Sequence, residues 1–328
     1  MKRLCLQFVL EAETPISHAE GVEGNHSLHA MRKQRQPDGS YLSVPIISAD
    51  TMRHGLRETA AILCLDAAGL LTQEGGAKLS ESALRLLFSG GMLTGRGDAG
   101  TIKLDRWREI CEVLPVVSLM GGCVDAMMIP GKVQCSDAKL ICAETAHATW
   151  SWAIANQTWA PWSEQMEHCQ RVRFDVTRDK HKQFLLSETA QADVHRRLLA
   201  KESAHEKADH AAEPEDRGRP MPHSYVAIAA GARLSWEITG ANLSDLERSV
   251  LLSSLALMFE TWRFGGKRGT GHGKLRALSC QDVALPSVSP MASEADVAAL
   301  SGTAIGVVRA HMQAQRDKLS ALLATVDA

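Results

Sequence analysis

The sequence predicts an α+β domain of the ferredoxin-like type, an antiparallel sheet with helices, that carries large insertions between its two halves. Two observations support this class. Residues 3–11 and residues 233–238 each alternate between apolar and polar side chains, which is typical of half-buried strands in an antiparallel sheet. Each of these segments is followed by a helical pattern, so the order along the chain is strand, helix, irregular middle, strand, helix, strand.

The first strand is predicted over residues 3–11. Every second side chain from Leu4 to Leu10 is apolar, so one face of this strand is expected to be buried. Thr14-Pro15 ends the strand. A polar segment rich in histidine and basic residues follows over residues 18–35, and we expect an irregular connection there.

A long helix is predicted next, with Ser48 or Asp50 as its N-cap. Apolar side chains recur at steps of three and four over residues 52–70. Arg53 and Arg57 lie one turn apart on a face away from this apolar stripe. They form either a solvated helix face or, near the helix N-terminus, a contact for the phosphates of a nucleic-acid backbone.

The middle of the chain is irregular. Apolar runs at residues 113–120 and 138–143 predict buried strands or short helices. Residues 180–222 differ in composition, because no large apolar residue appears between Leu199 and Met221 while charges of both signs alternate densely. Such a segment cannot form a core of its own, so an excursion from the domain is expected.

The second half of the domain is predicted with a strand over residues 233–238. Ser244 and Glu247 form a capping box that opens a helix to about Phe259. A short strand follows over residues 275–278. A last amphipathic helix is expected from residues 293–296 to about Leu323.

Composition and charge bound the function. The chain has 328 residues, 36 basic and 38 acidic side chains, a net charge of −2 and 45% hydrophobic residues. These values exclude collagen-like, disordered and disulfide-scaffold classes, and they argue against a protein that coats nucleic acid by bulk charge. The eight cysteines form no Cys-x-x-Cys pair and the apolar runs fit neither a signal peptide nor a membrane span, so a cytoplasmic protein without membrane contact is expected.

The glycine run from Gly265 to Lys274 is the strongest local signal. Five basic residues and no acidic residue lie between Thr261 and Arg276. Glycines let backbone N–H groups converge on a phosphate, and the cations add charge complementarity. The run follows a helix and precedes a strand and has arginine at position 268, so it is neither a dinucleotide fingerprint nor a Walker loop. A plain helix-to-strand connection remains the alternative.

Other clusters have weaker signals. A second basic patch contains Arg32, Lys33, Arg35, Arg53 and Arg57. Histidines near it offer a general acid or base for RNA chemistry, although no spacing supports a catalytic or metal site, and no metal or cofactor is expected. These histidines are His18, His26, His29 and His54. Four tryptophans between residues 150 and 162 either stack bases or pack in the core, and packing is favoured.

Three segments, in order, resemble the RAMP superfamily of CRISPR proteins. Residues 6–21 resemble its first strand and "TP" turn, residues 44–57 (VPIISADTMRHGLR) resemble its "iPgsSlrGaLR" segment, and residues 265–274 resemble its C-terminal glycine-rich loop. Together they bracket about four fifths of the chain. The length and the region from Leu119 to Val133 look most like the "Cas seven" backbone subunits, in particular the type IV version.

This resemblance implies a particular architecture. It implies an RRM-like palm over residues 1–280, with a finger or middle insertion at about 72–165 and a thumb at about 175–222. Residues 281–328 would form a helical tail packed on the palm.

The resemblance also implies a function. In the family, copies stack along one CRISPR RNA and hold it for pairing with a DNA or RNA target, together with other effector subunits. The positions that would contact RNA by this resemblance, including two at the thumb base, are Ser48, Arg53, Arg57, Lys180, Lys182, Gly266, Lys267, Arg268, Gly269, Gly271, His272, Gly273 and Lys274; the basic patches add Arg32, Lys33, Arg35 and Arg263.

Two departures and two alternatives stand beside this hypothesis. Type III relatives carry a cleaving aspartate after the first strand, but residues 18–35 contain none, and the glycine loop is more basic than usual. A non-catalytic RNA scaffold is therefore expected. A RAMP-type endoribonuclease that uses His26 or His54, and a metabolic enzyme that binds a phosphorylated ligand through the glycine loop, are the alternatives.

Overall fold

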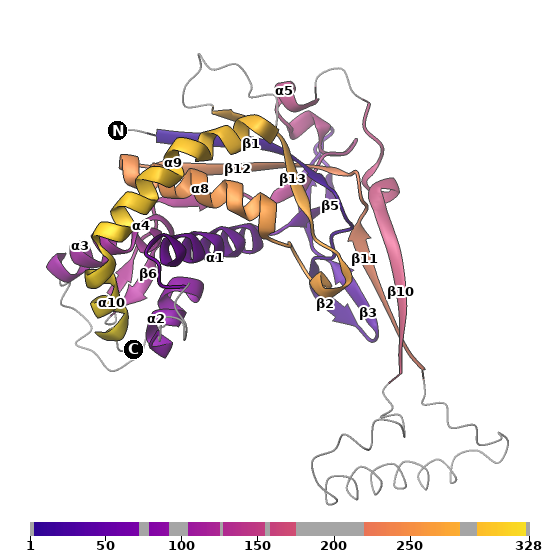
Figure 1. The fold of residues 1–328 in the computed structure, drawn as a ribbon. Coiled ribbons are helices and arrows are strands. Elements are labelled where there is room, and N and C mark those ends of the chain that lie inside the picture. Colours follow the sequence, from indigo (N-terminus) through magenta and orange to yellow (C-terminus); the bar gives the residue numbers. More distant parts are fainter. Residues whose placement is uncertain are drawn as a thin grey trace, which may run out of the picture. The chain divides into compact units, whose positions relative to one another are not determined.

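The computed structural model describes residues 3–71, 79–91, 104–124, 127–154, 158–174, 220–282 and 294–325 (Figure 1). The chain forms two compact units. The first contains residues 1–21, 28–168 and 226–328, and the second contains residues 22–27 and 169–225. Most of the predicted thumb, including Lys180 and Lys182, lies outside the described residues.

The described strands are β1 (Arg3–Ala12), β2 (Ala19–Glu23), β3 (His26–His29), β4 (Met31–Arg35), β5 (Tyr41–Ile47), β6 (Gly122–Val124), β7 (Met127–Ile129), β8 (Val133–Cys135), β9 (Ala138–Leu140), β10 (Met166–Phe174), β11 (Pro220–Ile228), β12 (Arg233–Ala241) and β13 (Leu275–Asp282). The described helices are α1 (Ala49–Ala67), α2 (Glu81–Leu84), η1 (Arg85–Ser89), α3 (Leu104–Val113), α4 (Pro115–Met120), η2 (Ala146–Ala148), α5 (Ser151–Ile154), η3 (Trp162–Gln165), α8 (Asp245–Thr261), η4 (Arg268–Thr270), α9 (Glu294–Ala314) and α10 (Arg316–Thr325).

The main sheet has the ferredoxin-like order. Its strands lie in the order β13-β1-β12-β9-β5-β4, and β8 also pairs with β12. The chain runs β1, α1, β9, β12, α8, β13, and the neighbouring strands in β13-β1-β12-β9 are all antiparallel. In the ferredoxin-like fold each helix connects two strands of the same sheet, and the fourth strand lies beside the first. Here β13 is the fourth strand and β1 is the first. The predicted α+β fold class is confirmed.

The core lies between this sheet and the helices on one of its faces. Alternate side chains of β1 and β12 are buried there, with the Phe8 and Trp236 rings 5.3 Å apart and Phe8 also 5.7 Å from Phe259 of α8. Helices α1, α8 and α9 pack against one another on this side of the sheet (Figure 1). Val308 and Met312 of α9 are fully buried, so the C-terminal segment is part of the core.

The predicted helix starts at Ser48 and Ser244 are confirmed. Ser48 is the N-cap of α1, where its hydroxyl accepts a hydrogen bond from the Thr51 N–H. Ser244 caps α8 through the predicted capping box with Glu247. The buried Glu247 carboxylate also accepts hydrogen bonds from Ser118 and from Lys132 Nζ, at 2.6 Å for the lysine. Burial opposes ionisation of Glu247, but these hydrogen bonds lower its pKa overall.

Two expectations from the sequence differ from the structure. Residues 18–35 are not an irregular connection, because they form β2, β3 and β4. The expected single C-terminal helix is two helices, α9 and α10. The short, mostly polar strands β2 to β4 carry little periodic signal, which explains the first difference. The apolar run at 113–120 contains the short buried helix α4, one of the two forms predicted for it. No helix in the described segments is long and apolar enough to cross a membrane.

The second unit contains residues 22–23 of β2, 26–27 of β3, 169–174 of β10 and 220–225 of β11. The order of this second sheet is β10-β11-β3-β2, and β11 runs parallel to β3 where Ser224 lies opposite His26. His26 Nδ1 lies 2.7 Å from Ser224 Oγ. A recess of about 280 Å³ is lined there by Glu23, Asn25, His26, Gln170, His223 and Ser224.

Candidate nucleic-acid interface

The glycine run forms a compact loop between α8 and β13. The Phe264 N–H donates to the Gly273 carbonyl at 2.8 Å, which closes the loop, and η4 forms its tip. Gly265 and Gly273 have φ angles of +75° and +93°, and a Cβ atom at either position would lie within 2.3 Å of a backbone oxygen. Only glycine fits these two positions, so the glycines at the base of the loop have a structural reason.

The loop is held by the turn that follows β1. The Gly266 N–H donates to the Ser17 carbonyl at 2.6 Å, and the Gly273 N–H donates to the Pro15 carbonyl at 2.9 Å. The Lys274 N–H donates to the Thr14 hydroxyl at 2.9 Å. The "TP" turn and the glycine loop are therefore in direct contact, although about 250 residues separate them in sequence.

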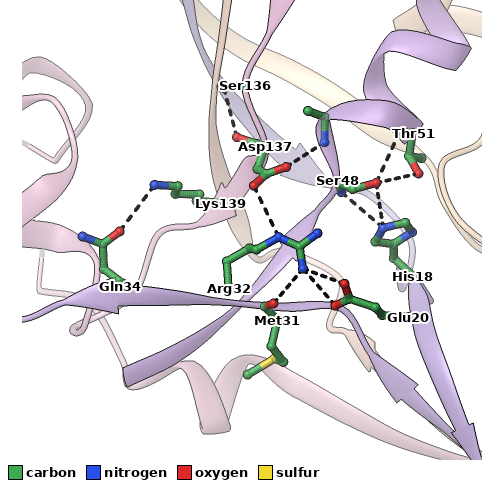
Figure 2. Close-up of polar contacts among 11 residues, drawn as sticks. His18, Glu20, Met31, Arg32, Gln34, Ser48, Thr51, Ser136, Asp137 and Lys139 are labelled. Atoms are coloured by element: carbon green, nitrogen blue, oxygen red, sulfur yellow. Dashed lines mark hydrogen bonds and ion pairs between the residues drawn. The ribbon is translucent and has the colours of Figure 1, made fainter. Parts of the chain in front are cut away.

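His18, which follows Ser17 in this turn, connects the turn to helix α1. His18 Nε2 lies 3.1 Å from Ser48 Oγ and accepts a hydrogen bond from the Ser48 N–H at 3.2 Å (Figure 2). Burial lowers the pKa of His18, in agreement with a neutral ring that accepts here. The structure thus brings the three sequence motifs together in the first unit.

The N-terminus of α1 is not an open anion site. Asp137 Oδ1 accepts a hydrogen bond from the Ala49 N–H at 2.7 Å, and the Asp137 carboxylate also faces Arg32 at 3.8 Å (Figure 2). A carboxylate thus complements the positive end of the helix, where a phosphate was expected. Arg32 Nη1 donates to both oxygens of Glu20, at 2.7 and 2.9 Å, so acids on two sides partly neutralise the arginine.

Arg53 and Arg57 both donate hydrogen bonds to backbone carbonyls of the first unit, and their predicted placement at a nucleic-acid backbone stays a prediction. Arg57 is 8% exposed, and its Nη2 donates to the carbonyls of Met120 and Gly121 at 2.8 and 2.9 Å. Arg53 donates to the Met120 carbonyl and, at 2.7 Å, to the Val133 carbonyl. Burial, with the nearby Arg53 charge, lowers the pKa of Arg57 to about 10. The two arginines hold the C-terminal end of α4 against α1.

Acids from β1 and the turn after it neutralise part of the acid-free stretch. Lys274 Nζ lies 2.6 Å from Glu13, and Arg276 donates to Glu11 at 2.7 Å. The stretch lacks acids in sequence but not in space, because β1 is the neighbour of β13 in the sheet. Lys274 is therefore a paired cation in the fold, and its predicted contact with RNA stays a prediction.

The remaining predicted positions are more accessible. Lys33 and Arg35 are exposed on β4, the edge strand of the main sheet. At the loop tip Gly266, Lys267, Arg268, Gly269 and Gly271 are exposed, while Arg263 and His272 are half-buried. The Arg268 guanidinium carbon lies 4.3 Å from the centroid of the Trp262 ring. These positions form the accessible part of the candidate interface.

The other face of the main sheet is partly covered. Gln7 points to that face but is only 8% exposed, and its amide oxygen accepts a hydrogen bond from Trp152 Nε1 at 3.1 Å. The Trp150 ring is parallel to Trp152, with centroids 5.8 Å apart. Trp152 therefore packs on the sheet, in line with the packing alternative. An ordinary RRM stacks bases on an open sheet face, and here Trp152 covers part of that face.

Sequence reasoning missed the acids of the site. Glu13, Glu20 and Asp137 each contact a basic side chain or a helix-terminal N–H from another part of the chain, and a single acid has no sequence motif that would reveal such a contact. Among the described residues no group of three or more His, Cys, Asp or Glu side chains could hold a metal ion.

Comparison with known proteins gives one kind of match. No protein-family model matches the chain, and no curated protein matches it. A chain of the solved structure titled "Type IV-B CRISPR Complex" is similar in fold, with a TM-score of 0.51 and 15% sequence identity; the match covers 88% of this chain and 93% of that chain. At this identity the likeness establishes a shared fold.

Proposed function

We propose that this chain is a RAMP-type subunit of a CRISPR effector complex and binds CRISPR RNA without cleaving it. The observation that carries the proposal is the convergence of the three motifs: the turn at Thr14–His18 contacts both the Ser48 cap and the glycine loop in the first unit. The fold shared with a chain of a type IV-B CRISPR complex supports the same assignment.

The charge distribution determines how such a subunit would bind. Several cations near the three motifs are neutralised by acids or buried, which leaves few for RNA phosphates. A single copy is therefore expected to bind weakly. Copies stacked along one RNA would add their contacts, so affinity would come from a filament that also contacts other effector subunits and the target nucleic acid. Base pairing would supply sequence specificity.

A charge-reversal experiment tests the role of the loop in phosphate binding. Arg263→Glu combined with Arg268→Glu alters the loop without removing the Lys274–Glu13 pair. We expect weaker binding of single-stranded RNA and a salt slope of log K that is smaller by about 0.7 for each phosphate that the variant no longer neutralises. Arg108→Glu, at an exposed position of α3, is the control. Unchanged affinity and slope in the double variant would contradict the proposal.

The state of the purified protein separates a scaffold from a metabolic enzyme. A subunit that stacks on RNA should copurify with nucleic acid, and its oligomers should shrink after ribonuclease treatment. A monodisperse, nucleic-acid-free protein whose melting temperature rises with a small phosphorylated ligand would favour the metabolic enzyme.

The endoribonuclease remains the rival, since the recess of the second unit contains two imidazoles. His26, held by Ser224, and His223 could serve as acid and base on RNA without a metal. Incubation with labelled CRISPR repeat RNA in a chelator tests this. Site-specific cuts that disappear in His26→Ala, in His223→Ala or in His54→Ala, the other histidine considered from the sequence, would overturn the scaffold proposal, and intact RNA would support it.

A further inference from the structure

The environment of Trp262 at the base of the glycine loop has no role in the function proposed so far. Trp262 is 8% exposed and follows α8 directly. Gly55 of α1 makes room for it, because a Cβ atom at that position would lie 2.7 Å from the indole nitrogen. His54 meets the indole edge-on, with centroids 5.8 Å apart. The ring is therefore fixed between α1 and the loop.

Arg268 lies on this fixed ring. Its Cζ is 4.3 Å from the ring centroid, and its Nε donates to the Gly265 carbonyl at 3.2 Å. Arg268 is exposed, and in the described part of the chain no acid forms an ion pair with it. The cation–π contact and the hydrogen bond restrain the guanidinium, so its side away from the indole faces solvent.

We infer that the outer surface of the Arg268 guanidinium is a stacking site for a nucleobase of single-stranded RNA. Arginine planes stack on unpaired bases, and a guanidinium that is already held on an indole loses less side-chain freedom on binding. This inference rests on the proposed function and deepens it, because it assigns a base contact to a loop that was expected to contact phosphates only.

A charge-conserving substitution separates stacking from charge. Arg268→Lys keeps the positive charge but removes the plane, and Arg108→Lys, at an exposed position of α3 outside the candidate interface, is the control. Two probes are used with the full chain: a short uridine RNA and an abasic ribose-phosphate chain of the same length. Thermal unfolding of each variant verifies that the fold is retained.

We expect Arg268→Lys to bind the uridine RNA about tenfold more weakly than the wild type, and to bind the abasic chain equally well. Arg108→Lys should bind both probes like the wild type. Equal affinity of Arg268→Lys and wild type for the uridine RNA would overturn the stacking site. An equal loss of affinity for both probes would also overturn it, because Arg268 would then contact phosphate. A wild type that binds neither probe would instead disprove the proposed function.

Discussion

Replacement of the buried His29 tests how burial limits the pH range of the fold. His29 is 7% exposed, and neither ring nitrogen has a hydrogen-bond partner in the described part of the chain. Its ring lies 6.3 Å from that of His18. Burial first, and the His18 charge second, lower the pKa of His29 from 6.5 to about 4, although the nearby backbone of Val226 and Ile46 opposes the shift.

The pH dependence of stability follows from the difference between the unfolded and the folded pKa of His29. Above the unfolded pKa neither state binds the proton at His29. Between the unfolded pKa and about 4, the unfolded chain binds the proton and the folded chain does not. As the pH is lowered through this window, the free energy of unfolding therefore falls by about 1.4 kcal/mol per pH unit, and by about 3 kcal/mol in all.

Urea unfolding at several pH values measures this contribution. The leucine of His29→Leu cannot bind a proton. When the pH is lowered from about 7 to about 5, the free energy of unfolding of the wild type should therefore fall by about 2 kcal/mol more than that of the variant. His168→Gln, at an exposed position, is the control and should follow the wild type. Parallel pH profiles of wild type and His29→Leu would refute the reasoning, because the His29 ring would then be charged or hydrated in the fold.

Three further predictions concern stability and are measured by urea unfolding at neutral pH. Arg57→Leu removes the side-chain donor of the Gly121 carbonyl and one of the two arginine donors of the Met120 carbonyl, and should cost about 2–4 kcal/mol; a cost below about 1 kcal/mol would contradict its structural role. Gly273→Ala should cost more than about 2 kcal/mol, whereas Gly269→Ala, with open space around it, should change stability by less than about 0.5 kcal/mol; equal effects would be inconsistent with the loop geometry. Glu247→Gln weakens the hydrogen bonds with Lys132 and should cost about 1–3 kcal/mol, and an unchanged midpoint would argue against the buried pair.

The local elements of the fold were predictable because their signals are local. The alternation in β1, the Ser48 cap and the capping box at Ser244 each depend on residues a few positions apart. Strands β2–β4 were missed, because pairing with distant strands stabilises them and their side chains are mostly polar.

The candidate site was predictable only in part. The motifs identified the turn, the cap and the loop, but a count of charges along the chain cannot show which charges meet in space. Arg57 meets carbonyls at the end of α4, and Lys274 meets Glu13 from about 260 positions earlier. The partners in these pairs are far apart in sequence, so the sequence does not reveal them. The stretch that lacks acids in sequence is therefore partly neutralised in the fold by acids from β1 and the turn after it.

The attachment of the glycine loop to the turn after β1 constrains how the chain can vary. Gly266 and Gly273 both donate to that turn, and so fix the number of residues between them. An insertion or deletion between these two anchors would move one of them off its acceptor. The tip at residues 268–271, between the two anchors, can change in chemistry at constant length. Substitutions at the tip should therefore be tolerated better than insertions or deletions between the two anchors.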